Sequence, residues 1–379
     1  MKTSLSSLDL MHLSKELDGL LRDSYIEKVY QLEKKKFKFK IRHRSLGNLS
    51  LILSLPNFIF LSSYDWKSPE KPSALAMRLR KLLKGCKIKK VEQHDFERIL
   101  IFELEKKEER LKLIAELFSK GNLFLLDESM KIIALLERQE WKHRKLKLNE
   151  KYEFPPESFS PSKGYDAFKE RLRSQKKRKV VVALAKDLNF GGILAEEICM
   201  RSGIDKSRSV DELSLDEVQS LYSVLLEILS LPTNPRIILS NENEAIDVVP
   251  IAFKIYEGKK FKSFENFNSA LDEFFSKKEL AMVEKEKLDA LEKLLERKKI
   301  QENLIKEYES KLKDLKLKAD FIYQHLHEID ALLSEIREMR KSSSLSEVKE
   351  KFVGKKLYGF KILSLDESGE IEIEYEKSS

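Results

Sequence analysis

One segment of the chain is dense in chemically active side chains. His94-Asp95-Phe96-Glu97-Arg98 places an imidazole, two carboxylates and a guanidinium within five residues, a group that could move protons or bind an anion. A polar turn held by local ion pairs would have the same composition. No HExxH, GxSxG, Walker A or GxGxxG pattern occurs. His325 and His327 stand two apart on a predicted helix, so they cannot share a metal ion. We expect no catalytic residue, no cofactor and no metal site.

Basic residues form three clusters, at residues 34–44, 78–90 and 171–179. Such clusters bind phosphates by releasing counterions from nucleic acid, although each could instead be a solvated surface. Trp141 to Lys145 adds an aromatic residue beside basic ones. Together the clusters favour RNA or DNA as a partner, and the candidate phosphate-binding residues that we take from them are Arg78, Arg80, Lys81, Arg171, Arg173 and Lys177.

A glycine pair separates two short apolar segments in LAKDLNFGGILAEEI. Gly191 and Gly192 stand between them, and Ala195 follows where close helix packing needs a small side chain. This spacing predicts a helix-hairpin-helix, in which the backbone N–H groups at a helix N-terminus could bind a phosphate. Gly191 and Gly192 are therefore candidate phosphate-binding residues. A purely structural turn between helices would use the same glycines.

The elements that must position these groups alternate between helix and strand in the first 155 residues. Apolar spacing predicts a helix over residues 7–22, strands within 25–60 and a second helix that Gly85 ends. Further strands are expected at 88–93, 99–104, 111–117 and 122–126. This pattern predicts an α+β protein with a mixed N-terminal domain.

The sequence after residue 157 predicts several smaller domains. Prolines and serines at 154–164 indicate a domain boundary. Beyond 276, a charged helix without proline carries an apolar seam through Ala319, Ile322, Leu326, Ile329, Leu333 and Ile336, typical of a coiled coil. A solvated helix is the alternative. We expect domains at 1–157, at 163–235 (helix-hairpin-helix), at 236–276 (connecting strand and helix), at 277–341 (coiled coil) and at 342–379 (a small module with a β-hairpin turning at 366–369).

The composition excludes several classes of protein. The 72 Lys and Arg against 64 Asp and Glu give a net charge of +8, which suits an acidic partner. Cys86 and Cys199 lack CxxC partners, which excludes a disulfide framework and a cysteine zinc site. No signal-peptide core occurs, and no apolar run reaches the roughly 18 residues of a membrane span. We expect a cytoplasmic protein without a membrane partner, and the Lys- and Glu-rich composition indicates heat adaptation.

Several segments, taken in order, resemble the NFACT family, which includes ribosome-associated quality-control elongation factors and bacterial proteins once called fibronectin-binding. They are SSLDL, IEKVYQ, KPSALAMRLRKLLKG, EQHDFERI, ELFSKGNLFLLDE, YEFPP and LNFGGILAEEICMRSGID. The resemblance implies an archaeal or thermophilic member with a glycosylase-like N-terminal domain. It also implies that the chain stops before a returning coil and an RNA-binding domain, in which case the long helix could pair with a second copy as a homodimer.

The resemblance further implies a non-catalytic factor that recognises large ribosomal subunits carrying a stalled peptidyl-tRNA. Such factors hold a tRNA, for which we expect alanyl-tRNA, and promote template-free tailing of the nascent chain for degradation. They contact ribosomal RNA and proteins through the coiled coil. The family's functional acidic residue falls on Asp9 and its Asp-Arg pair on Glu97 and Arg98, where Glu adds a methylene. With His94, these are the candidate tRNA-binding residues.

Two other functions share part of this layout. A formamidopyrimidine-DNA glycosylase combines an N-terminal domain with a helix-hairpin-helix, but it needs an N-terminal proline, and this chain begins Met1-Lys2-Thr3. A nucleic-acid-binding protein of that layout without glycosylase activity is the first alternative. The second is an adhesion module for an extracellular matrix protein, which the lack of a signal peptide disfavours.

Overall fold

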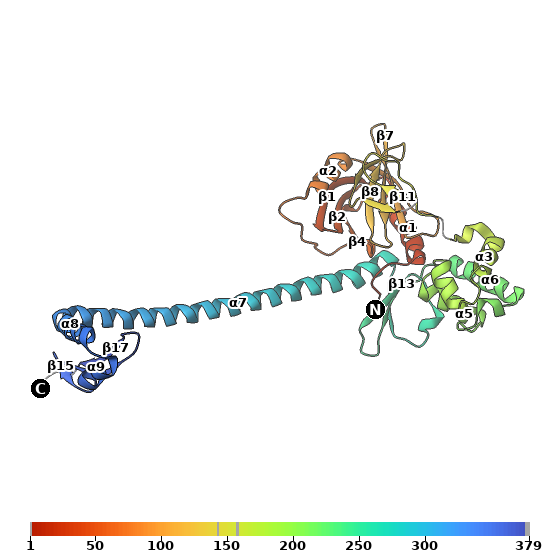
Figure 1. Ribbon diagram of the computed structural model, residues 1–379. Coiled ribbons are helices and arrows are strands. Elements are labelled where there is room, and N and C mark those ends of the chain that lie inside the picture. The colour runs from red at the N-terminus through yellow and green to blue at the C-terminus, as the bar shows by residue number, and fades with distance from the viewer. Residues whose placement is uncertain (1, 142–143, 157–158, 376–379) are drawn as a thin grey trace. The chain divides into compact units, whose positions relative to one another are not determined.

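The computed structural model describes residues 2–141, 144–156 and 159–375 (Figure 1). The chain divides into two compact units, residues 1–283 and 284–379. The α+β class expected from the sequence is confirmed, because the described residues combine antiparallel sheets with helices, one of them 58 residues long.

Nine antiparallel strands of the described chain form one sheet, in the order β4-β3-β2-β1-β5-β6-β7-β8-β9. Tyr25↔Lys87 is the single register pair between β1 and β5, so the sheet has two halves that meet at a narrow junction. The strands are β1 (Tyr25–Glu33), β2 (Lys36–His43), β3 (Gly47–Ser54), β4 (Phe58–Ser62), β5 (Lys87–Gln93), β6 (Ile99–Lys106), β7 (Glu109–Glu116), β8 (Asn122–Leu126) and β9 (Ile132–Leu135).

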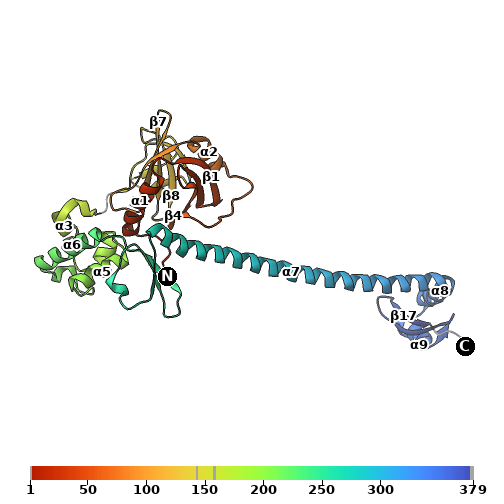
Figure 2. The same ribbon diagram turned by 180° about the vertical axis from the view of Figure 1, so that it is seen from behind.

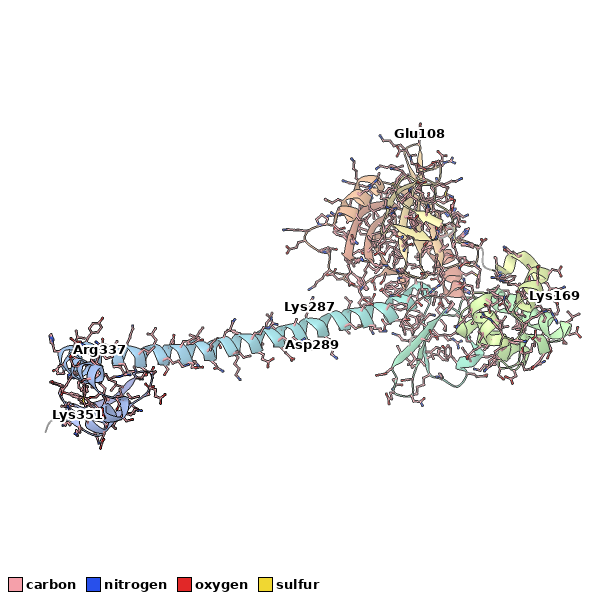
Figure 3. The ribbon with its side chains drawn as sticks, in the orientation of Figure 1. Glu108, Lys169, Lys287, Asp289, Arg337 and Lys351 are labelled. Carbon is pink, nitrogen blue, oxygen red and sulfur yellow. The ribbon has the colours of Figure 1, made fainter. Side chains whose placement is uncertain are left out.

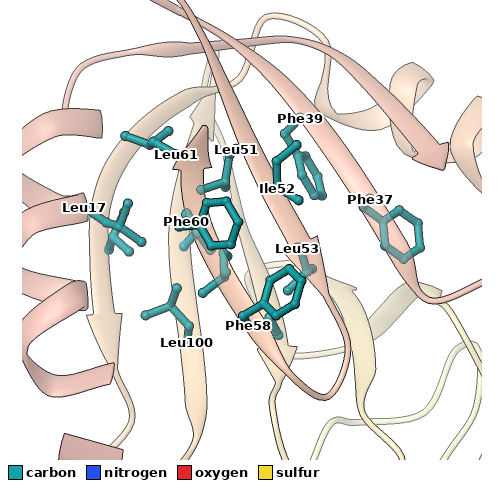
Figure 4. Packing of buried hydrophobic residues seen from close by; sticks show 14 of the residues in the cluster. Leu17, Phe37, Phe39, Leu51, Ile52, Leu53, Phe58, Phe60, Leu61 and Leu100 are labelled. Carbon is teal, nitrogen blue, oxygen red and sulfur yellow. The ribbon is translucent and has the colours of Figure 1, made fainter. Parts of the chain in front are cut away.

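Both halves of the sheet contribute side chains to one apolar core. Alternation in β2 turns Phe37 and Phe39 inward. Figure 4 shows Leu17, Phe60 and Leu100 in this core, and they come from a helix and from strands of both halves. The two helices of this region are α1 (Ser7–Leu21) and α2 (Ala74–Leu83), drawn with the sheet in Figures 1 and 2. A small hairpin, β10 (Gln139–Trp141) with β11 (Arg144–Leu146), follows the sheet.

A helical region with its own core follows. Its helices are α3 (Gly164–Arg173), α4 (Val180–Val182), a π-helix (Ala183–Asp187), α5 (Gly192–Ser202) and α6 (Leu215–Ser230). α4, the π-helix and α5 lie on either side of the Gly191–Gly192 turn, where the sequence predicts a helix-hairpin-helix. Buried Phe168, Phe190 and Leu225 belong to this core, and so does Phe96, which comes from the turn before β6. The proposed boundary at residue 157 lies outside the described residues.

A three-stranded sheet and the start of the long helix close the first unit. Its order is β13-β12-β14, with β12 (Arg236–Leu239), β13 (Ala245–Val249) and β14 (Phe261–Ser263). The first turns of α7 (Phe267–Gln324) cover the edge of the nine-stranded sheet, because Asn268 exchanges hydrogen bonds with the backbone of Leu61 at 2.7 and 2.9 Å. Phe275 stacks on Phe58 with ring centroids 4.5 Å apart.

The second unit holds the end of α7, α8 (Leu326–Ser342), α9 (Leu345–Phe352) and a sheet of β15 (Lys356–Leu357), β16 (Phe360–Leu365) and β17 (Ile371–Tyr375). The predicted hairpin at 366–369 joins β16 to β17. The helix predicted over 277–341 is divided in the structure, because α7 ends before His325 and α8 begins after it. The His325 ring lies 4.4 Å from the Tyr375 ring and 4.8 Å from the Phe321 ring, so an aromatic cluster fixes the break.

Candidate nucleic-acid interface

The turn at residues 94–98 lies against the turn of the helical hairpin. Asn189 Nδ2 donates to Glu97 Oε2 at 2.9 Å, and the Phe96 ring meets the Phe190 ring edge-on at 6.0 Å. Gln93 Nε2 donates to the carbonyl oxygens of Ser7 and Glu97 at 2.9 and 2.8 Å. Thus three segments, the start of α1, the 94–98 turn and the hairpin turn, meet at one junction.

Arg98 is half-buried at this junction. Its Nη1 lies 3.4 Å from the carbonyl oxygen of Leu5, and within the described ranges no carboxylate forms an ion pair with it. Burial lowers the pKa of Arg98, and the charge of Glu97 opposes that shift. A guanidinium stays protonated at neutral pH even so, and the bond to Leu5 is the one hydrogen bond that its donors make within the described residues.

Asp9 lies inside the fold. Its side chain is 2% exposed and closes a capping box with Ser6 at the start of α1, accepting from the Ser6 backbone N–H and hydroxyl at 2.7 Å each. The ammonium of Lys2 lies 2.8 Å from the same carboxylate. All three contacts fall on Oδ2, and through them Asp9 positions the start of α1.

His94 stacks on the ring of Phe154, with centroids 3.7 Å apart and planes 17° from parallel. Its Nε2 lies 3.6 Å from the Asp95 carboxylate. The hollow beside it, lined by Phe96, Pro155 and Phe159 among others, measures about 10 Å³. That is too small for a nucleobase, since a single water needs about as much.

The hairpin turn depends on Gly191, which has φ 80° and ψ 162°, a conformation that is almost exclusive to glycine. The Gly191 N–H donates to the Ala185 carbonyl at 3.1 Å. Gly192 is exposed, and it opens α5. The Gly191 N–H is therefore not available to a phosphate. The N–H groups of the first turn of α5 have no partner within the helix, and phosphate binding by them stays a prediction.

The predicted basic clusters are mostly, but not entirely, accessible. Arg78, Lys81, Arg171 and Lys177 are exposed. Arg173 is half-buried and donates to the Leu213 carbonyl at 3.0 Å, and Arg80 Nε donates to the Val29 carbonyl at 2.6 Å. In the cluster at 141–145, Lys142 and His143 lie outside the described residues. Arg144 is buried in an ion pair with Glu116, so its interpretation as a surface cation is wrong.

Sequence reasoning missed Lys2 and Asn189. Asn189 precedes a Phe-Gly-Gly turn and adopts φ 62°, a conformation in which Asn is enriched, so the LNFGG pattern was the available signal. Lys2 carried no such signal, because its partners Asp9 and Asp247 come from different parts of the chain.

The chain is similar to known proteins over most of its length. It shares 32% identity over 370 residues with the archaeal Rqc2 homolog aRqcH of Methanocaldococcus jannaschii, which covers 92% of this chain and 54% of that protein. Identity to the human ribosome quality control complex subunit NEMF is 24% over 372 residues, covering 89% of this chain and 34% of that protein. The chain thus spans about half or a third of these relatives.

Among solved structures, the N-terminal part of the fibronectin/fibrinogen-binding protein from Streptococcus suis has the same fold. It matches with a TM-score of 0.57 and 23% identity, and the match covers 72% of this chain and all of that one. The NFACT N-terminal and middle domains, as a family profile, match residues 6–357. This chain therefore belongs to the NFACT family.

Proposed function

We propose that this chain is the RNA-binding part of a ribosome quality-control factor. It recognises large ribosomal subunits obstructed by peptidyl-tRNA, binds a tRNA, with alanyl-tRNA the one we expect, and promotes template-free C-terminal tailing of the nascent chain for degradation. The support is membership of the NFACT family together with similarity to a relative that is named as a ribosome quality control complex subunit. Because the chain spans only part of that relative, the activity of the whole protein is part of this proposal.

The observation that carries the tRNA-binding proposal is the position of Arg98. This guanidinium lies where the N-terminal sheet meets the helical hairpin, with no carboxylate partner among the described residues. A charged group held half-buried without an ion pair is costly to a fold. A phosphate of bound RNA would supply that missing partner through two parallel hydrogen bonds.

Glu97 and Asp9 position the backbone segments around Arg98. Glu97 holds Asn189 and thereby the hairpin turn, while Asp9 fixes the start of α1 beside Leu5. His94 stacks on Phe154 at the edge of the same turn and can approach RNA from there. Arg171, Arg173 and Lys177 would extend the phosphate-binding surface beyond the junction.

This function needs no catalytic group. We propose a non-enzymatic factor of the cytoplasm whose partners are tRNA and the RNA and proteins of the large subunit. Within the described residues no helix is long and apolar enough to cross a membrane, and no three His, Cys, Asp or Glu residues gather as metal ligands would.

The test measures tRNA binding of the full chain by filter binding at fixed salt, with Arg98→Ala as the variant. Losing a charged hydrogen-bonding group costs about 1.5–3 kcal/mol, so we expect Kd to rise roughly 10- to 100-fold. Arg98→Lys keeps the charge but lacks the planar guanidinium, so its Kd for tRNA should lie between that of the unmodified chain and that of Arg98→Ala.

Arg110→Ala is the matched control, because Arg110 is exposed on the β6–β7 hairpin and its loss removes the same charge. Crosslinking in cell extract, followed by sequencing of the bound RNA, tests the partner. Large-subunit rRNA together with one tRNA family, lost in Arg98→Ala, is the expected result. Unchanged tRNA affinity of that variant would refute the role of Arg98.

A further inference from the structure

A second basic surface of the N-terminal domain forms a groove with aromatic walls. The groove has a volume of about 450 Å³, and it lies over β1, the end of β2 and the turn after α2. It is lined by Tyr25, Ile26, Glu27, Lys28, Tyr30, Lys40, Arg42, Lys84 and Gly85. None of these residues belongs to the junction around Arg98.

A β-bulge gives this groove its two tyrosines. The register of β1 on β2 shifts between Ile26 and Lys28. As a result Tyr25 pairs with Arg42, Lys28 with Lys40 and Tyr30 with Lys38, which places these side chains on one face of the sheet. Strict alternation would have put Tyr25 and Tyr30 on opposite faces. Ile26 and Val29 turn into the core instead.

The groove unites two basic clusters that are separate in the sequence. Lys40 and Arg42 come from the cluster at 34–44, and Lys84 comes from the one at 78–90. With Lys28, four cations line the groove against one carboxylate, Glu27, which lies 3.6 Å from Arg42. The neighbouring Lys38 is withdrawn from it, because its ammonium donates to the Trp66 carbonyl at 2.7 Å.

The tyrosines differ in accessibility. Tyr25 is 38% exposed, and the Arg42 guanidinium carbon lies over its ring, 5.6 Å from the centroid. Tyr30 is half-buried between cations, with Lys28 at 4.9 Å and Arg80 at 4.7 Å from its centroid. Burial raises the pKa of Tyr30, but the Lys28 hydrogen bond and the charges of Lys40 and Arg80 outweigh it, so the pKa lies below its ordinary value.

We propose that this groove binds unpaired nucleotides of RNA, with a base stacked on Tyr25 and phosphates held by Lys28, Lys40 and Lys84. Proteins that bind single strands combine a basic groove with aromatic platforms, and bases also stack on arginine planes. A surface for phosphate alone would need the lysines but not the bulge that places both tyrosines on the basic face of the sheet. A duplex keeps its bases inside the helix and could not use Tyr25.

This second RNA contact does not depend on Arg98, although it agrees with the proposed function. The test measures fluorescence anisotropy of the full 379-residue chain with a labelled single-stranded RNA of about ten nucleotides, a length within the site sizes of single-strand binders. The comparison ligands are the same backbone without bases, an RNA duplex of equal length and inorganic polyphosphate. The single strand should bind most tightly.

Two groove variants separate stacking from charge. Tyr25→Leu should weaken binding of the single strand roughly tenfold and abolish its advantage over the abasic backbone. Lys28→Gln with Lys84→Gln should instead reduce the salt dependence, by roughly 0.7 in the log–log slope for each lysine. Tyr323→Leu is the matched control, because Tyr323 is 77% exposed on α7. Melting curves verify that each variant is folded.

The outcomes distinguish this inference from the proposed function. Arg98→Ala should bind tRNA weakly, while its affinity for the short single strand should be unchanged. If the chain does not bind tRNA but its affinity for the single strand decreases in Tyr25→Leu, the groove is supported and the tRNA proposal is refuted. Equal binding of abasic and base-bearing strands, preference for duplex or polyphosphate, or an unchanged affinity in Tyr25→Leu would each overturn the proposed groove.

Discussion

At the residue scale, a buried charge network determines what Asp9 can do. Lys2 lies 2.8 Å from Asp9 and 3.5 Å from Asp247, and Tyr256 donates to Asp247. Burial lowers the pKa of Lys2, but the two carboxylates outweigh it and the net pKa is raised. The network joins the chain start, α1 and β13. A loss of RNA binding in an Asp9 variant could therefore reflect a disturbed junction as much as a lost RNA contact.

We predict that Asp9→Ala destabilises the fold. The change removes the reciprocal half of the capping box, in which the Asp9 carboxylate accepts from the Ser6 N–H, and it leaves Lys2 with the more distant Asp247. The free energy of unfolding should fall by about 3 kcal/mol, in the range for breaking a buried pair. Urea denaturation measures it, with Asp289→Ala as the control, since Asp289 is exposed on α7 (Figure 3). A difference below the error of the method would contradict this account of the network.

His12 makes the stability of the fold depend on pH. Its ring is 5% exposed, its Nδ1 lies 3.2 Å from the Thr233 hydroxyl, and its Nε2 has no partner in the described structure. Burial, reinforced by the charge of Lys15, lowers the pKa of His12 from 6.5 to about 4. The unfolded state therefore binds this proton first as the pH falls.

We predict that the free energy of unfolding is constant above about pH 6.5 with respect to this group and decreases between pH 6.5 and 4. The decrease should reach roughly 3 kcal/mol, from about 1.4 kcal/mol for each unit of pKa difference. Urea melts across this range measure it. His12→Gln cannot bind the proton and should remove this part of the slope. The same slope in both proteins would mean that other groups cause it.

At the element scale, the hairpin turn tests which of the two glycines matters. Gly191 adopts a conformation restricted to glycine, whereas Gly192 has ordinary helical geometry and nothing within 4 Å of an added Cβ. We predict that Gly191→Ala destabilises the fold by about 1–3 kcal/mol, while Gly192→Ala is neutral or slightly stabilising. Thermal melts compare the two. Equal effects would show that the turn relaxes around the added methyl group.

The apolar residues predicted as a coiled-coil seam lie at the end of α7 and on α8. Ile329 and Ile336, two predicted seam residues, pack instead on the core of the small module with Val348 and Phe352. Ile322 and Leu326 are left exposed. The apolar spacing of three and four predicts this helix face, but its residues are divided between the core of the small module and solvent.

At the scale of the whole molecule, α7 carries exposed apolar residues that a partner helix could cover. Leu291, Ile305, Tyr308, Leu312 and Leu315 are each more than half exposed, although large apolar surfaces are usually buried. Figure 3 shows Lys287 and Asp289 projecting from opposite sides of this helix. Exposed apolar residues together with charged ones are typical of a helix that pairs.

We predict that the chain forms a homodimer through this stripe. Sedimentation equilibrium should show a dimer at micromolar concentration, and the double variant Ile305→Lys with Leu312→Lys should be monomeric because it places charge in the seam. Leu215→Lys is the control, since Leu215 is equally exposed but lies on α6. A monomer for the unmodified chain at tens of micromolar would disprove the dimer.

The sequence by itself determined the elements and the family. Alternating Phe37 and Phe39, the Ser6–Asp9 cap and the glycine turn are local signals, because each depends on residues a few positions apart. Composition and segment order sufficed to predict the α+β class and an NFACT protein. The 94–98 turn stood out through its residue types alone.

The tertiary structure decided what these residues contact. Glu97 meets Asn189 across 92 positions, Lys2 meets Asp247, and one bulge turns Tyr25 and Tyr30 to the same face as Lys40. A single register shift exchanges the faces of a strand, and no local pattern in the sequence reports it. The Arg98 junction and the tyrosine groove exist because packing brings together distant segments whose separate signals are only charge and shape.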